Sequence, residues 1–192
     1  MKKLVCCVAA MAVMLMSSAA AVEVSAESAI LLDAESGAVL YEKAADRRRL
    51  IASTTKIMTA LLVLETCDPE DVVEIPKECE YVEGSSMYLR AGECLTVREL
   101  LYGLLLLSGN DAGLALAIHA GGGDPARFVA EMNRFVEKLG LRDTHFENPH
   151  GLDGEAHYAS ARDLARLTIR AMENEEFREI VSTKEIRIAG RA

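Results

Sequence analysis

A serine and a lysine stand three residues apart in this chain of 192 residues, at Ser53 and Lys56. Apolar residues recur behind them at Ile57, Leu61 and Leu64, a spacing that predicts a helix with Ser53 at or just inside its N-terminus. Side chains three positions apart share one face of a helix, so the Lys56 amine can reach the Ser53 hydroxyl. A serine hydroxyl is a weak nucleophile that needs a base, and a lysine of lowered pKa can be that base. The pair therefore predicts covalent catalysis through Ser53.

A second polar group, Ser108-Gly109-Asn110, interrupts an apolar helical stretch. A Ser-x-x-Lys pair alone is expected about once by chance in a chain of this length, and it also fits a capped helix with a solvated lysine. The polar triplet is more informative because buried polar groups are costly unless they are satisfied, although local capping is the alternative explanation. In the catalytic interpretation, Ser108 relays a proton, and Asn110 holds a substrate carbonyl or Lys56. Together the two groups resemble those of the penicillin-recognising serine enzymes.

Further segments extend this resemblance over essentially the whole mature chain. They are residues 49–60, 84–87, 107–112, 139–146, 148–152 and 158–164. In them the chain resembles the D-alanyl-D-alanine carboxypeptidases, the low-molecular-weight penicillin-binding proteins. The resemblance implies that Ser53 is the acylated nucleophile, Lys56 its general base and Ser108 the relay to the leaving amine. It also implies that Asn110 is a substrate-holding amide and that residues 84–87 form the loop beside the active site, where Ser86 is assigned to substrate binding.

The function implied by the resemblance is a serine D-Ala-D-Ala carboxypeptidase, which removes the terminal D-Ala from peptidoglycan pentapeptides through an acyl-enzyme. β-Lactam antibiotics are then expected to bind covalently, and no cofactor or metal is expected. Two alternatives stay open. One is a serine β-lactamase, although the Glu-x-x-Leu-Asn motif that is usual in those enzymes is missing from the sequence. The other is a non-catalytic penicillin-recognising sensor or binding domain.

The third motif of the family, Lys-Thr-Gly, does not occur in these 192 residues, and Lys184 is followed by Glu185. In the family this motif lies on a sheet strand that supplies part of the oxyanion hole and holds the terminal carboxylate of the substrate. The expectation is therefore a catalytic domain of residues 22–192 that is incomplete at its C-terminus, without activity as it stands. Relatives that carry a C-terminal membrane-surface helix make membrane association through such a segment a further expectation.

Strands are predicted near both ends of the chain. Two short β-type runs at residues 29–33 and 38–41 surround a turn that contains Gly37, which predicts a hairpin. Alternation at residues 185–188 predicts another strand.

Helices with recognisable caps fill the region between these strands. One helix is predicted by the helical spacing behind Ser53, and a second begins at the capping box Thr96-Val-Arg-Glu99. A third begins at Asp124-Pro125 and ends at Gly140, and a fourth begins at Ser160. This order predicts an α+β fold. The resemblance specifies it as the penicillin-binding/β-lactamase-like transpeptidase fold, in which helices and a helical subdomain flank an antiparallel sheet.

Residues 1–21 predict a secretory signal peptide. Lys2 and Lys3 precede an apolar run of 13 residues, which is shorter than the ~20 that span a membrane. Ala19-Ala20-Ala21 supplies the cleavage site, with residue 26 as the alternative end. The predicted location is the periplasm or the outer face of the cytoplasmic membrane of a bacterium.

Composition excludes one class of partner. The chain has 21 Lys and Arg against 30 Asp and Glu, a net charge of −9, so it lacks the basic face that nucleic acid binding needs. Three cysteines follow the predicted signal peptide, and separate thiols are favoured over a Cys67–Cys79 bridge, with Cys94 left over. The spacing of the four histidines matches no common zinc pattern, which favours ordinary polar roles for them.

Overall fold

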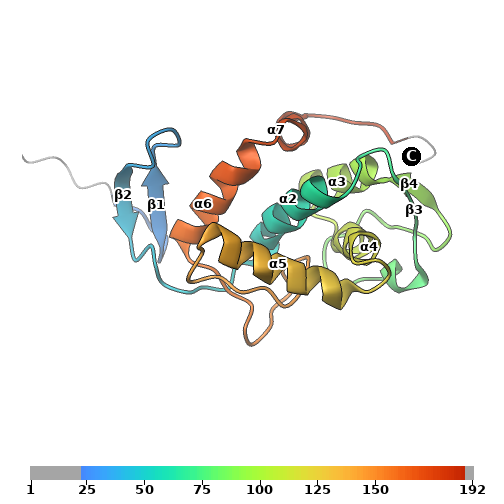
Figure 1. Cartoon of the computed structure of the whole chain (residues 1–192), viewed down its shortest axis with the longest axis horizontal. Helices are drawn as coiled ribbons and strands as arrows, with labels where there is room; N and C mark the ends of the chain where they lie inside the picture. The colour runs from blue at the N-terminus through green and yellow to red at the C-terminus, as the bar shows by residue number, and fades with distance from the viewer. Residues whose placement is uncertain (1–22, 189–192) are drawn as a thin grey trace, which may run out of the picture.

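The computed structural model describes residues 23–188, in which helices are the most frequent regular elements (Figure 1). The predicted signal peptide of residues 1–21 lies outside these residues. Within them, no helix combines the length and the apolar character needed to cross a membrane. The elements follow in the order β1 (Ala29–Leu32), β2 (Val39–Lys43), η1 (Ala52–Thr55), α2 (Lys56–Thr66), β3 (Val72–Glu74), η2 (Lys77–Cys79), β4 (Cys94–Thr96), α3 (Val97–Leu106), α4 (Asn110–Ala120), α5 (Pro125–Leu139), α6 (Ala161–Met172) and α7 (Glu175–Ser182).

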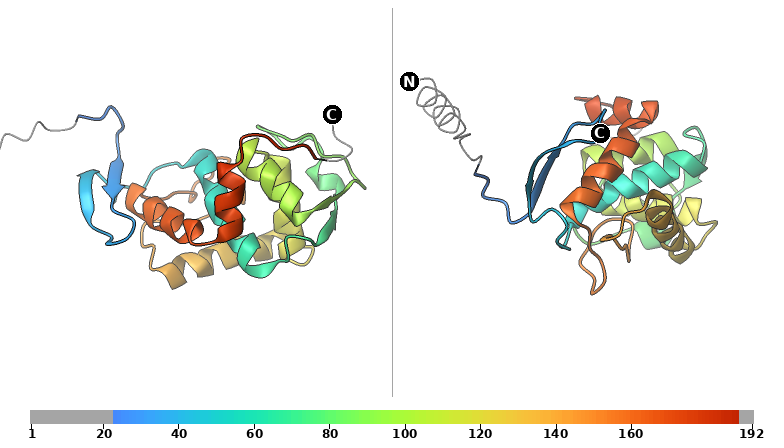
Figure 2. Two further views of the ribbon diagram at one scale, coloured as in Figure 1. Left: turned by 90° about the horizontal axis from the view of Figure 1, so that it is seen from above. Right: turned by 60° about the vertical axis from the view of Figure 1, so that its left-hand side comes forward.

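The central element is α2, which is apolar on nearly all sides. It contacts α3, α4, α5, α6 and α7, and its residues 58–63 are all buried. Such a helix is stable only when neighbours cover its whole circumference. The outer helices α5, α6 and α7 are amphipathic and contact α2. Figures 1 and 2 show how these helices are arranged around it. The first turn of α2 is thereby fixed in the middle of the helical layer.

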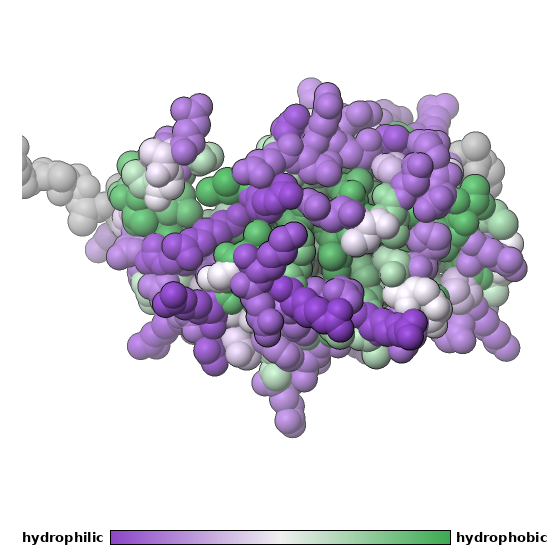
Figure 3. All heavy atoms as spheres, in the orientation of Figure 1, coloured by the Kyte–Doolittle hydropathy of each residue, from purple (hydrophilic) through white to green (hydrophobic). Residues whose placement is uncertain are grey.

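The predicted hairpin is confirmed by the antiparallel pairing of β1 with β2, in which Leu31 lies opposite Tyr41. It stands at one side of the helices, next to α6. Arg162 of α6 forms ion pairs with Glu42 and Asp46 that fasten the hairpin to the helices. Apolar side chains of the hairpin, such as Leu40 at 65% exposure, remain in contact with solvent (Figure 3).

Local capping accounts for the helix starts that the sequence predicts. Thr96 and Glu99 exchange hydrogen bonds with each other's backbone amides, a complete capping box at the start of α3. The Asp124 side chain caps α5, and the Ser160 hydroxyl caps α6. Gly140 ends α5 with a φ of 67°, in the left-handed region where glycine has no steric penalty.

The prediction of a strand at residues 185–188 is wrong, because these residues form no strand in the structure. They run beside Tyr102, Leu106 and Leu107 of the α3 region, and Ile188 packs partly against the core. An alternating sequence becomes a strand only with a hydrogen-bonding neighbour, and none of the described strands pairs with this segment. The short pair β3 and β4, and helix α7, were not predicted.

Candidate active site

The predicted nucleophile Ser53 lies on the 3-10 turn η1, directly before α2. Its neighbour Ala52 has a φ of 44°, in the left-handed region that non-glycine residues rarely adopt. Ser53 is exposed, whereas Thr55 and Lys56 beside it are buried. The turn therefore presents Ser53 to solvent and directs the side chains of Thr55 and Lys56 into the protein.

The Lys56 amine is surrounded by three oxygen acceptors. Its Nζ lies 3.0 Å from Ser53 Oγ, 2.7 Å from Asn110 Oδ1 and 2.8 Å from the His150 carbonyl oxygen. Only 2% of the residue is exposed. Burial disfavours the charged form and lowers the pKa of Lys56 from 10.5 to about 8. About one amine in ten is therefore neutral at pH 7.

The same three contacts determine where the lone pair of the neutral amine points. The His150 carbonyl and the Asn110 Oδ1 oxygen accept hydrogen bonds and have no proton to give. The two N–H bonds of a neutral Lys56 therefore go to these two acceptors. The lone pair is left facing Ser53 Oγ, which is the arrangement that a general base for the serine requires.

Asn110 is held so that its oxygen faces the lysine. Its Nδ2 donates to the Glu83 carbonyl at 2.6 Å, and its backbone N–H donates to the Ser85 carbonyl at 2.7 Å. Gly84, with a φ of 92°, passes so close that a Cβ there would lie 2.6 Å from Asn110 Nδ2. The loop between η2 and β4 and the first residue of α4 therefore fix the amide orientation together.

Asp111 organises the loop of residues 84–89. This buried carboxylate accepts hydrogen bonds from the Ser86 hydroxyl at 2.6 Å and from the backbone amides of Met87 and Leu89, both at 3.0 Å. The Ser86 side chain is thus bound to Asp111, and it is Ser85 that lines the pocket in front of Ser53. The structure therefore brings Ser85 to this pocket, whereas Ser86, which was assigned to substrate binding, does not line it.

Ser108 has a φ of 58° in the break between α3 and α4. It shares a largely apolar cavity of about 460 Å³ with Ser53 and Lys56. Within the described chain, no hydrogen bond joins its hydroxyl to either of them. The structure thus brings the predicted proton relay to the same cavity as the predicted nucleophile and its predicted base.

The loop of residues 148–152 supplies a wall that the sequence analysis did not assign. The Asn148 Oδ1 oxygen accepts from the backbone amides of His150 and Gly151 at 3.2 and 2.7 Å. The Pro149 carbonyl accepts from the Thr59 hydroxyl at 2.6 Å. At Gly151, with a φ of 93°, a Cβ would lie 1.9 Å from the carbonyl oxygen of Ala52. The loop is therefore in direct contact with the nucleophile turn.

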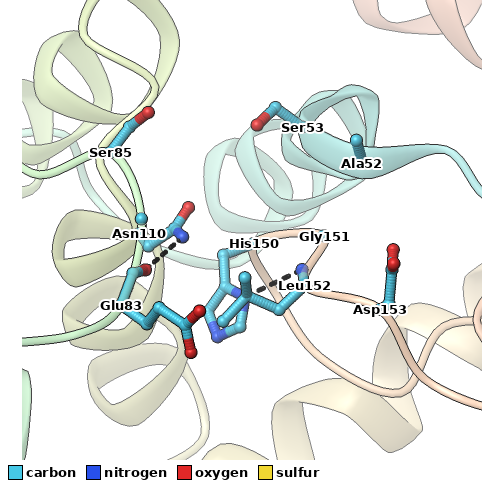
Figure 4. A pocket seen from close by; sticks show the side chains of 10 residues that line it. Ala52, Ser53, Glu83, Ser85, Asn110, His150, Gly151, Leu152 and Asp153 are labelled. Carbon is cyan, nitrogen blue, oxygen red and sulfur yellow. Dashed lines mark hydrogen bonds between the residues drawn. The ribbon is translucent and has the colours of Figure 1, made fainter.

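These segments enclose a pocket of about 640 Å³ (Figure 4). Ser53 and Ser85 lie on opposite sides of it, with Asn110 and His150 between them. Burial is the main reason that the pKa of His150 is lowered to about 4, so this imidazole is neutral at physiological pH. Two carboxylates, those of Glu83 and Asp153, also line the pocket.

The cysteines of the described chain carry free thiols, half-buried at Cys67, buried at Cys79 and exposed at Cys94. Burial raises the pKa of Cys79 to about 12, which keeps that thiol protonated. Among residues 23–188, no group of three or more His, Cys, Asp and Glu side chains could hold a metal ion.

Comparison with known proteins places this site in a family. Residues 15–191 match the D-alanyl-D-alanine carboxypeptidase family. The chain is 39% identical over 165 residues to D-alanyl-D-alanine carboxypeptidase DacF of Bacillus subtilis, covering 83% of this chain and 42% of the relative. It therefore spans less than half of the length of that protein.

Solved structures agree with this assignment. Penicillin-binding protein 6B of Escherichia coli is 36% identical, with a TM-score of 0.84 over 91% of this chain and 59% of that one. The Streptomyces K15 DD-transpeptidase is 39% identical, with a TM-score of 0.81 over 85% of this chain and 66% of that one. The fold is therefore the α+β fold of the low-molecular-weight penicillin-binding proteins, as predicted. The chain belongs to the D-alanyl-D-alanine carboxypeptidase family.

Proposed function

We propose that the protein containing this chain is a serine-type D-Ala-D-Ala carboxypeptidase that acts on peptidoglycan pentapeptides. The observation that carries the proposal is the buried Lys56 amine, 3.0 Å from the Ser53 hydroxyl and bound otherwise only to acceptors that cannot give it a proton. The membership of the chain in this family supports the choice of substrate.

The proposed reaction gives each of these groups a role. Lys56 takes the proton of Ser53 while the serine oxygen attacks the carbonyl carbon of the penultimate D-Ala. The C–N bond to the terminal D-Ala then breaks, and the proton that Lys56 took from Ser53 passes through Ser108 to the leaving amine. Water hydrolyses the resulting ester and restores the Ser53 hydroxyl. Asn110 orients Lys56 and offers its amide edge to the substrate. Ser85, on the opposite wall, is the serine of the 84–87 loop that we assign to substrate contact.

β-Lactams test the nucleophile, because their strained amide is attacked by the same hydroxyl. A fluorescent penicillin should label the intact protein at Ser53, and mass mapping of the labelled peptide should identify that residue. Ser53→Ala should abolish labelling, while Ser182→Ala, a serine at the end of α7, should leave it unchanged. Label on Ser108, or undiminished labelling of Ser53→Ala, would falsify the assignment.

The fate of the acyl group separates this function from its rivals. Release of D-Ala from a diacyl-Lys-D-Ala-D-Ala peptide, with slow loss of bound penicillin, supports a carboxypeptidase. Rapid penicillin turnover without D-Ala release indicates a β-lactamase, and stable labelling without peptide turnover indicates a sensor. Transfer of the acyl group to an added amine rather than to water would indicate a transpeptidase, the activity named for the Streptomyces relative.

We also infer export to the periplasm or to the outer face of the cytoplasmic membrane, directed by residues 1–21 as a signal peptide. The cationic start and the short apolar run support it. N-terminal sequencing of protein recovered from the cell envelope should begin at residue 22, or at residue 27 for the alternative site. Extraction with salt and then with detergent tests the membrane association proposed through a C-terminal segment.

A further inference from the structure

The imidazole of His157 is buried behind the nucleophile turn and held at both nitrogens. Its Nδ1 accepts the backbone N–H of Glu147 at 3.0 Å, and its Nε2 lies 2.7 Å from the Thr55 hydroxyl. His157 is 2% exposed and Thr55 is fully buried. The Phe146 ring meets the imidazole edge-on, with 5.7 Å between ring centroids. None of these contacts involves a group that takes part in the reaction proposed above.

The hydrogen bonds define the tautomer of His157. A backbone N–H can only donate, so Nδ1 must carry a lone pair, and the proton of the neutral ring lies on Nε2. The ring therefore donates to Thr55 Oγ1. Burial, the largest cause, lowers the pKa of His157 and so favours this neutral form.

Thr55 belongs to the same turn as Ser53, so this bond acts on the element that carries the nucleophile. The segment that contains His157 already binds the next turn of the helix, through the His150 carbonyl to Lys56 and the Pro149 carbonyl to Thr59. The bond from His157 adds a third attachment, nearer to Ser53 than the other two in sequence.

The turn needs such an attachment because it contains a strained residue. The left-handed φ of 44° at Ala52 persists only when the surroundings impose it. On one side, close contact with Gly151 restricts the Ala52 carbonyl. On the other, the hydrogen bond to Thr55 restrains the end of the same turn.

We propose that His157 is a positioning residue for acylation, which acts through Thr55 to hold the Ser53 hydroxyl in its reactive orientation. This inference rests on the proposed function, because it assumes that Ser53 is acylated. His157 does not touch the substrate. Its loss should slow the chemical step and leave binding of the β-lactam nearly unchanged, since misplacement of a reacting group by about 1 Å can cost ~100-fold in rate.

Two pairs of substitutions in the intact protein test this proposal. His157→Phe keeps a ring but removes both hydrogen bonds, whereas His157→Gln retains an N–H group that can donate to Thr55. Thr55→Val removes the acceptor with little change of shape, whereas Thr55→Ser keeps it. In stopped-flow acylation by a chromogenic β-lactam, the Phe and Val variants should lower the first-order acylation constant ~10- to ~100-fold, with less than about twofold change in the dissociation constant. The Gln and Ser variants should recover most of the loss.

His119→Gln is the matched control, because this partly exposed histidine lies near Asp71 and belongs to no part of the site. It should acylate at the parent rate. Thermal melting identifies any variant that fails to fold, and if His157→Phe does so, the Thr55 pair decides the question.

Equal first-order constants in folded Thr55→Val and parent would overturn the proposal. Equal losses in Thr55→Val and Thr55→Ser would also overturn it, because a role in packing alone gives no rescue by the retained hydroxyl. Both results leave the proposed function intact. That function fails separately, if Ser53→Ala is labelled like the parent.

Discussion

Replacing Asn110 by aspartate should move the pH dependence of acylation to higher pH. In the parent, burial lowers the pKa of Lys56 to about 8. About one amine in ten is then neutral at pH 7, and the acylation rate should rise about tenfold per pH unit below pH 8 and level off above it. The Asn110 oxygen lies 2.7 Å from the Lys56 amine. The Asn110→Asp substitution would place a negative charge at that distance.

The size of the effect follows from this distance. An opposite charge within ~4 Å typically moves a pKa by ~1 to 3 in favour of the charged form, here upward for the ammonium. The neutral fraction of Lys56 at pH 7 should fall by a factor between ~10 and ~1000, and acylation by penicillin should fall with it. Between pH 9 and 10 the acylation rate of the variant should rise toward that of the parent, because the Lys56 ammonium then loses its proton.

Rates of labelling by a fluorescent penicillin from pH 6 to pH 10 test this reasoning. Asn110→Ala is the control, since it also loses the bond from the amide to the Glu83 carbonyl but adds no charge. Its rate should be lower at every pH, with the rise still ending near pH 8. If the Asn110→Asp profile rises over the same pH range as that of the parent, Lys56 is not the base whose titration controls acylation.

Three further substitutions probe the elements that hold the site. Gly151→Ala should abolish penicillin labelling, because its Cβ would lie 1.9 Å from the Ala52 carbonyl oxygen. Gly140→Ala is the control, since nothing lies within 4 Å of its Cβ. This variant should label normally and lose about 1 kcal/mol of unfolding free energy. Asp111→Asn should lower the unfolding free energy by ~1–3 kcal/mol and slow labelling, because its NH₂ group would face donors of the 84–89 loop; urea titration and a labelling time course measure the two effects. Thr96→Ala should cost about 1 kcal/mol in urea titration through loss of the α3 cap, and an unchanged labelling rate would confirm that the cap is remote from catalysis.

Local chemistry explains which parts of the fold the sequence predicts. The starts of α3 and α6 were predicted correctly because a cap is formed by residues two or three positions apart, such as Ser160 and the amide of Asp163. The strands β3 and β4 have three residues each and depend on pairing between Val73 and Leu95, which no local pattern encodes. The prediction of a strand at residues 185–188 failed for the same reason, because the local sequence does not show whether another strand pairs with this segment.

The candidate site divides in the same way. Spacing along a helix brought Ser53 and Lys56 together, and the structure has their side chains in contact. The Lys56 amine is also bound by the backbone carbonyl of His150. Every residue has such a carbonyl, so the sequence does not show which one will contact the lysine. The choice between Ser85 and Ser86 likewise depends on the buried carboxylate of Asp111, 25 residues beyond Ser86 in the chain.

The contact between Lys56 and the His150 carbonyl joins residues 94 positions apart, and its consequence concerns the time at which the nucleophile becomes reactive. In an unfolded chain the lysine is solvated and has the ordinary pKa of 10.5, so only about one amine in 3000 is neutral at pH 7. Contacts between distant residues form late, because closing such loops costs entropy. We therefore expect an unfolded chain to react with penicillin far more slowly than the folded protein, and the rate of labelling should rise when residues 148–152 dock on α2.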